Sequence, residues 1–341
     1  MSNEHLFFHS MKQLLLLFLM VFMPTFMLAQ SSGGTIKRRP SPTNGTTSSV
    51  KSSNSSGQSN SSKKNPSKPT TRTTPSKSKG KQKPGKMQTH ERKSYDSDSH
   101  HYEKSDYEAN IELAFHGDAV AQSIIARCYM SGDGVIKDQA KAVEWYRKSA
   151  EQGNAYAQMC LGVCYEKEFG VTKDLKEAVK WYRKAAEQGD SNAQLFLGNC
   201  YGLGNGVQED MSQAFFWWNK SAEQGNEWAQ YYVGQCYKDE DNWEQASSWW
   251  KKAAEQGNKD AQFMLGVCYS LGKGVSPNDS LAAKWWKKSA EQGHTDAQFM
   301  IGVCYEGGEG VTKDPNQAIH WFRKAAEQGH EEAKKKLQLL K

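Results

Sequence analysis

Between residues 102 and 341 the apolar residues recur with the 3.6-residue rhythm of amphipathic α-helices, and the rhythm is interrupted at regular intervals. Each period reads as one helix, a glycine-containing loop and a second helix. In the second period the apolar positions are Ala157, Leu161, Cys164 and Tyr165 in the first helix and Ala178, Trp181, Tyr182 and Ala186 in the second. The pattern therefore predicts pairs of antiparallel helices and no strands.

The pairs repeat at a nearly fixed period. An Ala-Gln pair begins at residues 121, 157, 193, 229, 261 and 297, so the period is 36 residues except for one of 32. Such a period is typical of stacked supersecondary units. We predict an all-α fold, an α/α superhelical solenoid of six 36-residue helix-turn-helix repeats at 102–341. Capping helices are expected at 102–117 and 331–341.

Residues with special backbone roles mark the helix ends. An aspartate stands four residues before the recurrent alanine of the second helix at Asp138, Asp174, Asp210 and Asp314, where an N-cap belongs. A glycine suited to the left-handed conformation follows the second helix at Gly153, Gly189, Gly225, Gly257, Gly293 and Gly329. A glycine also lies inside the first helix at Gly162, Gly198, Gly234, Gly266 and Gly302. Because glycine costs a helix interior up to about 1 kcal/mol, we expect close contact there.

The fourth unit is four residues shorter than the others. The missing residues come from the loop, because "KDEDNWEQA" lacks the G-x-G-V element of the other units. We expect both helices of this unit to persist. The loop is then a connector and does not hold chemistry common to all units.

The first 29 residues have the pattern of a secretory signal peptide (1–29). One lysine precedes the apolar run 14–28, which ends at Ala29 and is followed by polar residues. A run of 15 residues is shorter than the roughly 20 that a membrane-spanning helix requires. We predict an extracytoplasmic protein, periplasmic or secreted, without a transmembrane span after cleavage. The alternative is a chain tethered to the membrane by an uncleaved N-terminal helix.

A polar segment connects this region to the repeats. Residues 31–101 contain 15 Lys/Arg and 3 Asp/Glu, whereas residues 102–341 contain 28 and 34. With few apolar side chains, the segment 30–101 is predicted to be a disordered basic Ser/Thr/Lys/Pro linker. Contact with an anionic polymer and a purely solvated tether both remain open. No specific nucleic-acid binding is predicted, because aromatic side chains do not interleave with the charges.

The cysteines are expected to be free thiols. Six of the seven share one position on the first helix: Cys128, Cys164, Cys200, Cys236, Cys268 and Cys304. Neighbouring helices pack about 8 to 10 Å apart, whereas a disulfide needs Cα atoms within about 7 Å. Cys160 and Cys164 lie one helical turn apart, but two thiols without a nearby histidine do not predict a metal site.

No constellation of catalytic residues recurs. The loop at Gly272 and Lys273 superficially resembles a phosphate-binding loop, but the spacing is wrong and Gly274 follows the lysine in place of Ser or Thr. The sequence "HEEAK" at His330 lacks the second histidine of a zinc-binding helix. We predict that the chain is not an enzyme and has no cofactor or metal.

The repeated sequence pattern resembles that of a known repeat family. The pattern A-Q-x-x-L-G-x-C-Y, then G-x-G-V, then D-x-x-x-A-x-x-W-Y-x-K-A-A-E-Q-G resembles the Sel-one-like repeat, a relative of the tetratricopeptide repeat. The resemblance covers 102–341 and implies a scaffold that holds macromolecules together, without intrinsic catalysis. A secreted cysteine-rich branch of the family staples each unit with a disulfide. Here the matching positions, such as Ala150 and Ala157, hold alanine.

Function is expected on the surface that varies between units. Along the first helix, the positions one before the alanine of the Ala-Gln pair and two, six and nine after it fall on one stripe. By resemblance to tetratricopeptide solenoids, this stripe should line the concave face and bind a protein or peptide. The predicted partner-binding residues are Tyr156, Met159, Val163, Trp228, Tyr231, Gln235, Phe263, Val267, Phe299 and Val303. The alternative for any one of them is packing against the adjacent helix.

Two hypotheses about function follow. The first is an exported, non-catalytic scaffold or adaptor that binds a protein or peptide partner on the concave face. The second is a binder or weak hydrolase of a cell-wall, glycan or β-lactam-type ligand, like the cysteine-rich relatives.

Overall fold

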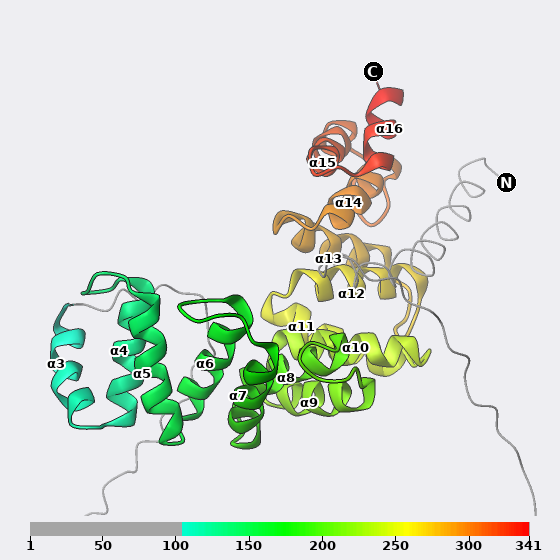
Figure 1. Ribbon diagram of the computed structural model, residues 1–341. Helices are drawn as coiled ribbons and strands as arrows, with labels where there is room; N and C mark the ends of the chain where they lie inside the picture. Colours follow the sequence, from blue (N-terminus) through cyan, green and yellow to red (C-terminus); the bar gives the residue numbers. More distant parts are fainter. Residues whose placement is uncertain (1–103, 341) are drawn as a thin grey trace, which may run out of the picture. The chain divides into compact units, whose positions relative to one another are not determined.

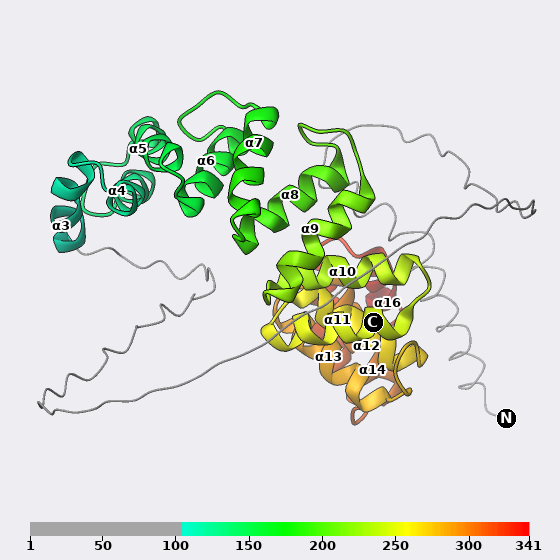
Figure 2. The same ribbon diagram turned by 90° about the horizontal axis from the view of Figure 1, so that it is seen from below.

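The computed structural model describes residues 104–340, and the predicted signal peptide and linker lie outside this range. All regular elements within it are α-helices, and each packs against the helices before and after it (Figures 1 and 2). The first helices of the six units are α4 (Ala119–Ser131), α6 (Ala155–Lys167), α8 (Ser191–Leu203), α10 (Glu227–Asp239), α12 (Lys259–Leu271) and α14 (Thr295–Gly307). The second helices are α5 (Gln139–Glu151), α7 (Leu175–Glu187), α9 (Met211–Glu223), α11 (Trp243–Gln256), α13 (Asp279–Glu291) and α15 (Pro315–Glu327).

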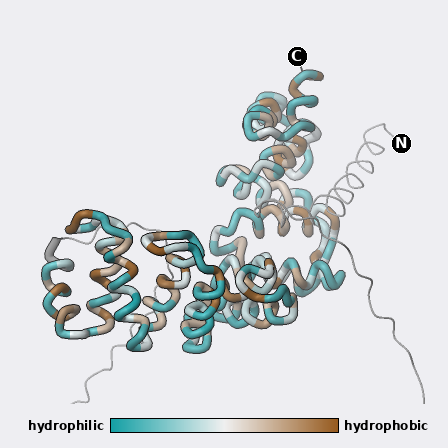
Figure 3. The backbone as a smooth tube through the Cα atoms, viewed as in Figure 1, coloured by the Kyte–Doolittle hydropathy of each residue, from teal (hydrophilic) through white to brown (hydrophobic). Residues whose placement is uncertain are grey.

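A single helix closes each end of the stack. These are α3 (Lys104–Phe115) before the first unit and α16 (Glu331–Leu339) after the last. The units stack in the order of the sequence (Figure 1), and apolar and polar residues are interspersed along the stack (Figure 3). The predicted solenoid with its caps is confirmed. Among the described residues, no helix has the length and apolar character that crossing a bilayer requires.

The helix ends have the predicted chemistry. Oδ1 of Asp174 accepts hydrogen bonds from the backbone N–H groups of Lys176 and Glu177, at 2.9 and 3.1 Å, and Asp138, Asp210 and Asp314 cap their helices in the same way. Gly153 follows α5 with φ of 92°, and its five counterparts also have φ between 85° and 112°. A residue with a Cβ would be strained at these positions.

Within each unit, the glycine of the first helix contacts an aromatic ring of the second. A Cβ added at Gly198 would lie 2.5 Å from the indole of Trp218, and one added at Gly162 would lie 2.6 Å from the ring of Tyr182. The expected close contact is therefore confirmed. The contacting ring belongs to the residue after the recurrent tryptophan.

Between units, buried glutamines form a hydrogen-bonded network. Nε2 of Gln158 donates to the carbonyl oxygen of Ala150 in the preceding unit at 3.0 Å, and Oε1 of Gln158 accepts from Gln188 at 2.7 Å. The same arrangement recurs at Gln122, Gln194, Gln230, Gln262 and Gln298, which are all buried. Each hydrogen bond contributes about 0.5–1.5 kcal/mol net to the stability of the fold. A buried donor or acceptor left without its partner costs more than that. The network explains why A-Q and E-Q-G recur together.

The loops also connect neighbouring units. Gly170, in the loop of the second unit, lies so close to the carbonyl oxygen of Gln139 that a Cβ would collide with it. Gly206, Gly274 and Gly310 contact the starts of α7, α11 and α13 in the same way. The fourth unit lacks this loop, and both of its helices are nevertheless formed, as predicted. Met211, at the start of α9, is 48% exposed.

Candidate functional site

The ten predicted partner-binding residues all lie on first helices, and they divide into two groups by burial. Four of them are buried, which fits the alternative that they pack against neighbouring helices: Met159, Phe263, Val267 and Val303. Phe263 is 1% exposed, and its ring stacks on His294 with the centroids 4.6 Å apart. The accessible group comprises the half-buried Tyr156, Val163, Tyr231, Gln235 and Phe299 and the exposed Trp228. We call this accessible group the first-helix face.

The fourth unit contributes three of these accessible residues from α10. Trp228 is 40% exposed, whereas Tyr231 and Gln235 are half-buried. The hydroxyl of Tyr231 accepts a hydrogen bond from Nε2 of Gln235 at 2.7 Å. Burial is the main cause of a strongly raised pKa of Tyr231, and the carboxylate of Asp260 adds to it. The phenol therefore keeps its proton at neutral pH and can donate it to an acceptor.

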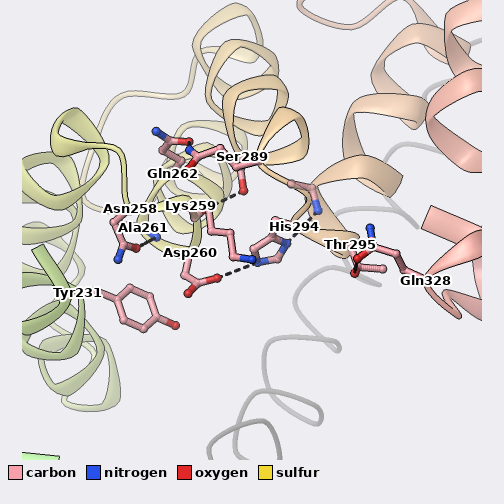
Figure 4. Close-up of polar contacts among 12 residues, drawn as sticks. Tyr231, Asn258, Lys259, Asp260, Ala261, Gln262, Ser289, His294, Thr295 and Gln328 are labelled. Atoms are coloured by element: carbon pink, nitrogen blue, oxygen red, sulfur yellow. Dashed lines mark hydrogen bonds and ion pairs between the residues drawn. The ribbon is translucent and has the colours of Figure 1, made fainter. Parts of the chain in front are cut away.

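A row of side-chain contacts that was not expected from the sequence links successive first helices. In three places, the N-cap residue of a helix contacts the residue just before the Ala-Gln pair of the preceding unit. Nδ2 of Asn226 donates to Oδ1 of Asn192 at 3.1 Å. Nε2 of His294 lies 3.6 Å from Oδ1 of Asp260, as Figure 4 shows. Nε2 of His330 lies 3.7 Å from Oδ1 of Asp296. We call these contacts rungs.

The rung between α12 and α14 has a defined protonation state. Nδ1 of His294 accepts the N-cap hydrogen bond from the backbone N–H of Ala297 at 3.2 Å, so the ring proton is on Nε2. Burial, with a smaller effect of Lys259, lowers the pKa of His294 to about 4. Burial also raises the pKa of the Asp260 carboxyl. At neutral pH the rung is therefore a neutral imidazole N–H directed at a carboxylate and not an ion pair.

This arrangement limits what the histidine can do chemically. Because Nδ1 is occupied by the helix cap, His294 has no free lone pair with which to accept a proton as a general base. The thiols are equally unreactive. All seven cysteines are free, and burial raises the pKa of Cys160 to about 11 and those of Cys164 and Cys200 to about 12. These three thiols are thus protonated at neutral pH. Cys236 is only half-buried, unlike the five other cysteines at its position.

The second helices present a different surface, on which lysines cover the recurrent tryptophans. Nζ of Lys184 lies 4.0 Å from the ring centroid of Trp181, and Nζ of Lys252 lies 3.8 Å from that of Trp249. The same three-residue spacing places Lys148, Lys288 and Lys324 over their own tryptophans. Among the residues that the structure describes, no three His, Cys, Asp or Glu side chains gather as a metal site would require.

Comparison with known proteins gives a consistent result for the repeat region. The family model described as Sel1 repeat matches six times, at residues 119–154, 155–190, 191–226, 229–258, 259–294 and 295–330. The fourth match is the short one, as the deletion in the loop requires. Comparison with curated proteins gave no match.

Two solved structures resemble this one over most of the repeats. The protective antigen c5321 of uropathogenic Escherichia coli, which displays an SLR fold, is 38% identical with a TM-score of 0.64. The match covers 68% of this chain and 51% of the antigen, so this chain spans about half of that protein's length. A Sel1 repeat protein of Oxalobacter formigenes is 32% identical with a TM-score of 0.62, covering 69% of both chains.

Cysteine rich protein B of Helicobacter pylori is also similar, at 25% identity over 37% of this chain and 93% of its own. Its TM-score of 0.32 is too low to support conclusions about this fold.

Proposed function

Because the chain belongs to the Sel1 repeat family, whose members are typically protein-interaction scaffolds, we propose that it is an exported, non-catalytic scaffold that binds a protein or peptide partner through the first-helix face. The observation that carries the proposal is the set of accessible aromatic residues, Trp228, Tyr231, Tyr156 and Phe299, on helices fixed by the glutamine network. Aromatic side chains held rigidly on a surface are frequent anchors in protein interfaces. They lose little conformational entropy on binding.

The proposed export is supported by the signal-peptide pattern of residues 1–29 and by one relative. The Escherichia coli relative is described as a protective antigen. We propose that this chain leaves the cytoplasm, with residues 1–29 as the export signal and the basic linker between them and the repeat region. Mass spectrometry of the protein purified from its native host tests this: a mature N-terminus near residue 30 is expected. An intact N-terminus in a membrane fraction would instead support the tethered form.

A ligand of the cell-wall, glycan or β-lactam type remains the alternative, but no contact in the structure favours it. The cysteine staples of the cysteine-rich branch are not formed by the free thiols of this chain. The His294 imidazole is committed to the helix cap and cannot activate a water molecule. Turnover of a β-lactam by the purified protein would overturn the non-catalytic part of the proposal.

Site-specific photo-crosslinking tests the partner surface. Trp228 is replaced by p-benzoylphenylalanine, and the protein is irradiated in its native host. The matched control carries the same replacement at Phe216, which is 46% exposed on the second helix α9. A discrete adduct is expected from position 228 and not from position 216. Equal adducts from both positions, or none from positions 228 and 299, would refute the proposed binding face.

A further inference from the structure

At the junction of the fourth and fifth units no such contact forms, and the donor there is buried. Asn258 caps α12, and its Oδ1 accepts from the backbone N–H of Ala261 at 2.8 Å. Its Nδ2 is buried without a hydrogen-bond partner, and the residue is only 3% exposed. The equivalent Asn226 donates its Nδ2 to Asn192. Buried amide donors are paired in the great majority of cases, so this exception requires an explanation.

The cause is the residue on the preceding unit. The acceptor of each rung stands immediately before the Ala-Gln pair, and in the fourth unit that residue is Trp228. An indole ring has no hydrogen-bond acceptor to offer in this position. The junction of the fourth and fifth units therefore has an unpaired buried donor, Asn258, and a large exposed aromatic side chain, Trp228, at the position where other units supply the acceptor. Each is unfavourable in the free protein, and a ligand that covers the indole and accepts from the amide would relieve both.

A third group with incomplete partners lies beside them. The Asp260 side chain is 25% exposed, and among the described residues the one basic side chain within 4 Å of its carboxylate is the neutral His294. Burial raises the pKa of this carboxyl, the charge of Lys259 offsets only part of that effect, and the carboxylate acts in turn on Tyr231. Figure 4 shows the Asn258 amide, the Tyr231 ring and the Asp260 carboxylate at the junction of α10, α12 and α14. A cation at this point would compensate the carboxylate charge.

We propose that Trp228, Tyr231, Asn258 and Asp260 bind an extended peptide segment through one lysine or arginine side chain and an adjacent backbone carbonyl. The proposal rests on the scaffold function argued above and specifies the partner's chemistry at the fourth and fifth units. The cationic group pairs with Asp260, and its aliphatic stem lies on the aromatic rings. The carbonyl oxygen accepts from Nδ2 of Asn258, which requires the exposed Trp228 side chain to turn outward.

The negative charge of Asp260 favours a peptide with a basic side chain over other classes of ligand. A nucleic acid, phosphate or sulfated glycan would place negative charge beside Asp260, which is repulsive. A neutral glycan would satisfy the amide and the rings but leave the carboxylate without a directly paired cation. A peptide with a basic side chain satisfies all three groups at once.

Two substitutions isolate the polar contacts. Asp260→Asn removes the charge and places there the residue that the third unit has at Asn192. Asn258→Ser removes the amide donor but keeps a hydroxyl that caps a helix well. The matched controls are Asp279→Asn, an exposed carboxylate at the start of α13, and Asn154→Ser, the same change of cap at α6.

Binding is measured on the full chain with fluorescein-labelled peptides by fluorescence anisotropy. The probes are acetyl-Ala-Leu-Ala-Lys-Ala-Leu-Ala-amide and its counterparts with acetyl-lysine or glutamate in the central position. We expect saturable binding of the lysine peptide alone. Asp260→Asn should weaken it by about tenfold or more, and Asn258→Ser by about fivefold, with both controls unchanged. Because Asn258→Ser removes an unpaired donor, its Tm should not fall.

Several results would overturn the proposal. They are equal binding of the acetyl-lysine or glutamate peptide, no saturable binding of the lysine peptide at millimolar concentration, and unchanged affinity in both variants. The crosslinking experiment separates this failure from failure of the scaffold function. If position 228 still captures a discrete partner whose crosslinked segment lacks a basic residue, the scaffold function holds and the preference for a cation is wrong.

Discussion

Acidification is expected to destabilise the C-terminal units through His294. The side chain is 15% exposed, and burial, followed by the charge of Lys259, lowers its pKa from 6.5 to about 4. A histidine with a depressed pKa in the folded state stabilises the fold fully above pH 6.5, and this contribution is lost as the pH falls towards 4. A tenfold change in a proton-binding constant corresponds to about 1.4 kcal/mol, so the full loss is about 3 kcal/mol.

Two nearby carboxyl groups act in the opposite direction. Burial raises the pKa of Asp260 and Asp296, so the folded state takes up their protons more readily than the unfolded state. Protonation of these groups relieves an unfavourable burial of charge and adds stability as the pH falls. The total pH profile of the protein therefore mixes both effects. A variant without a titratable side chain at position 294 is required to separate the effect of the histidine from that of the two carboxyl groups.

The variant is His294→Asn, because asparagine already caps α6, α10 and α12 and does not titrate. Urea unfolding of both proteins, followed by far-UV circular dichroism between pH 7 and pH 4, gives the free energy of unfolding of the C-terminal transition. The wild type should lose about 3 kcal/mol more than the variant across this interval. Parallel profiles, or a larger loss in the variant, would refute the assigned tautomer and the buried state of the imidazole.

Further predictions concern the residues that pack the helices and units together. Gly198→Ala should lower the free energy of unfolding by about 1–3 kcal/mol despite better helix propensity, because the added Cβ meets an indole; thermal unfolding measures this. Gln194→Leu should cost about 2–3 kcal/mol in urea unfolding, and adding Gln224→Leu should recover part of the loss, since the orphaned donor is removed. Gly170→Ala should lower Tm more than Gly189→Ala, because both have positive φ but only Gly170 faces backbone atoms; equal losses would contradict the loop contact.

The fold could be predicted because several independent signals agree in every unit. The caps at Asp174 and its equivalents, the glycines after the second helices and the small residues between helices all indicate the same boundaries. The deletion in the fourth unit was also informative, since a loop can shorten without loss of either helix. A solenoid repeats its local rules, so an error in one unit would be visible against the others.

Other features were not predictable from periodicity. The Ala-Gln and Glu-Gln-Gly elements were recognised as markers, but the bond between Gln158 and Gln188 depends on how the units stack. Burial depth was also missed. Phe263 and Phe299 occupy the same position, yet Phe263 is 1% exposed and Phe299 is half-buried. After α14 only one further unit helix and the short cap α16 follow, whereas α12 is followed by a complete unit. The caps of the first helices carried a readable signal, an Asp, Asn or His three residues before the recurrent alanine.

The rungs show where this array departs from uniformity. Framework positions hold the same residue type in nearly all units, but the two positions of a rung differ between units. Asn226 with Asn192 and His294 with Asp260 are different residue pairs that keep a donor opposite an acceptor. Only coordinated change preserves such a contact, because a buried donor that loses its acceptor costs about 1–3 kcal/mol. The pair Asn258 and Trp228 does not preserve it. Since this break falls in the unit that also lacks the loop, the specificity of the scaffold should be concentrated at the fourth unit and its junction with the fifth.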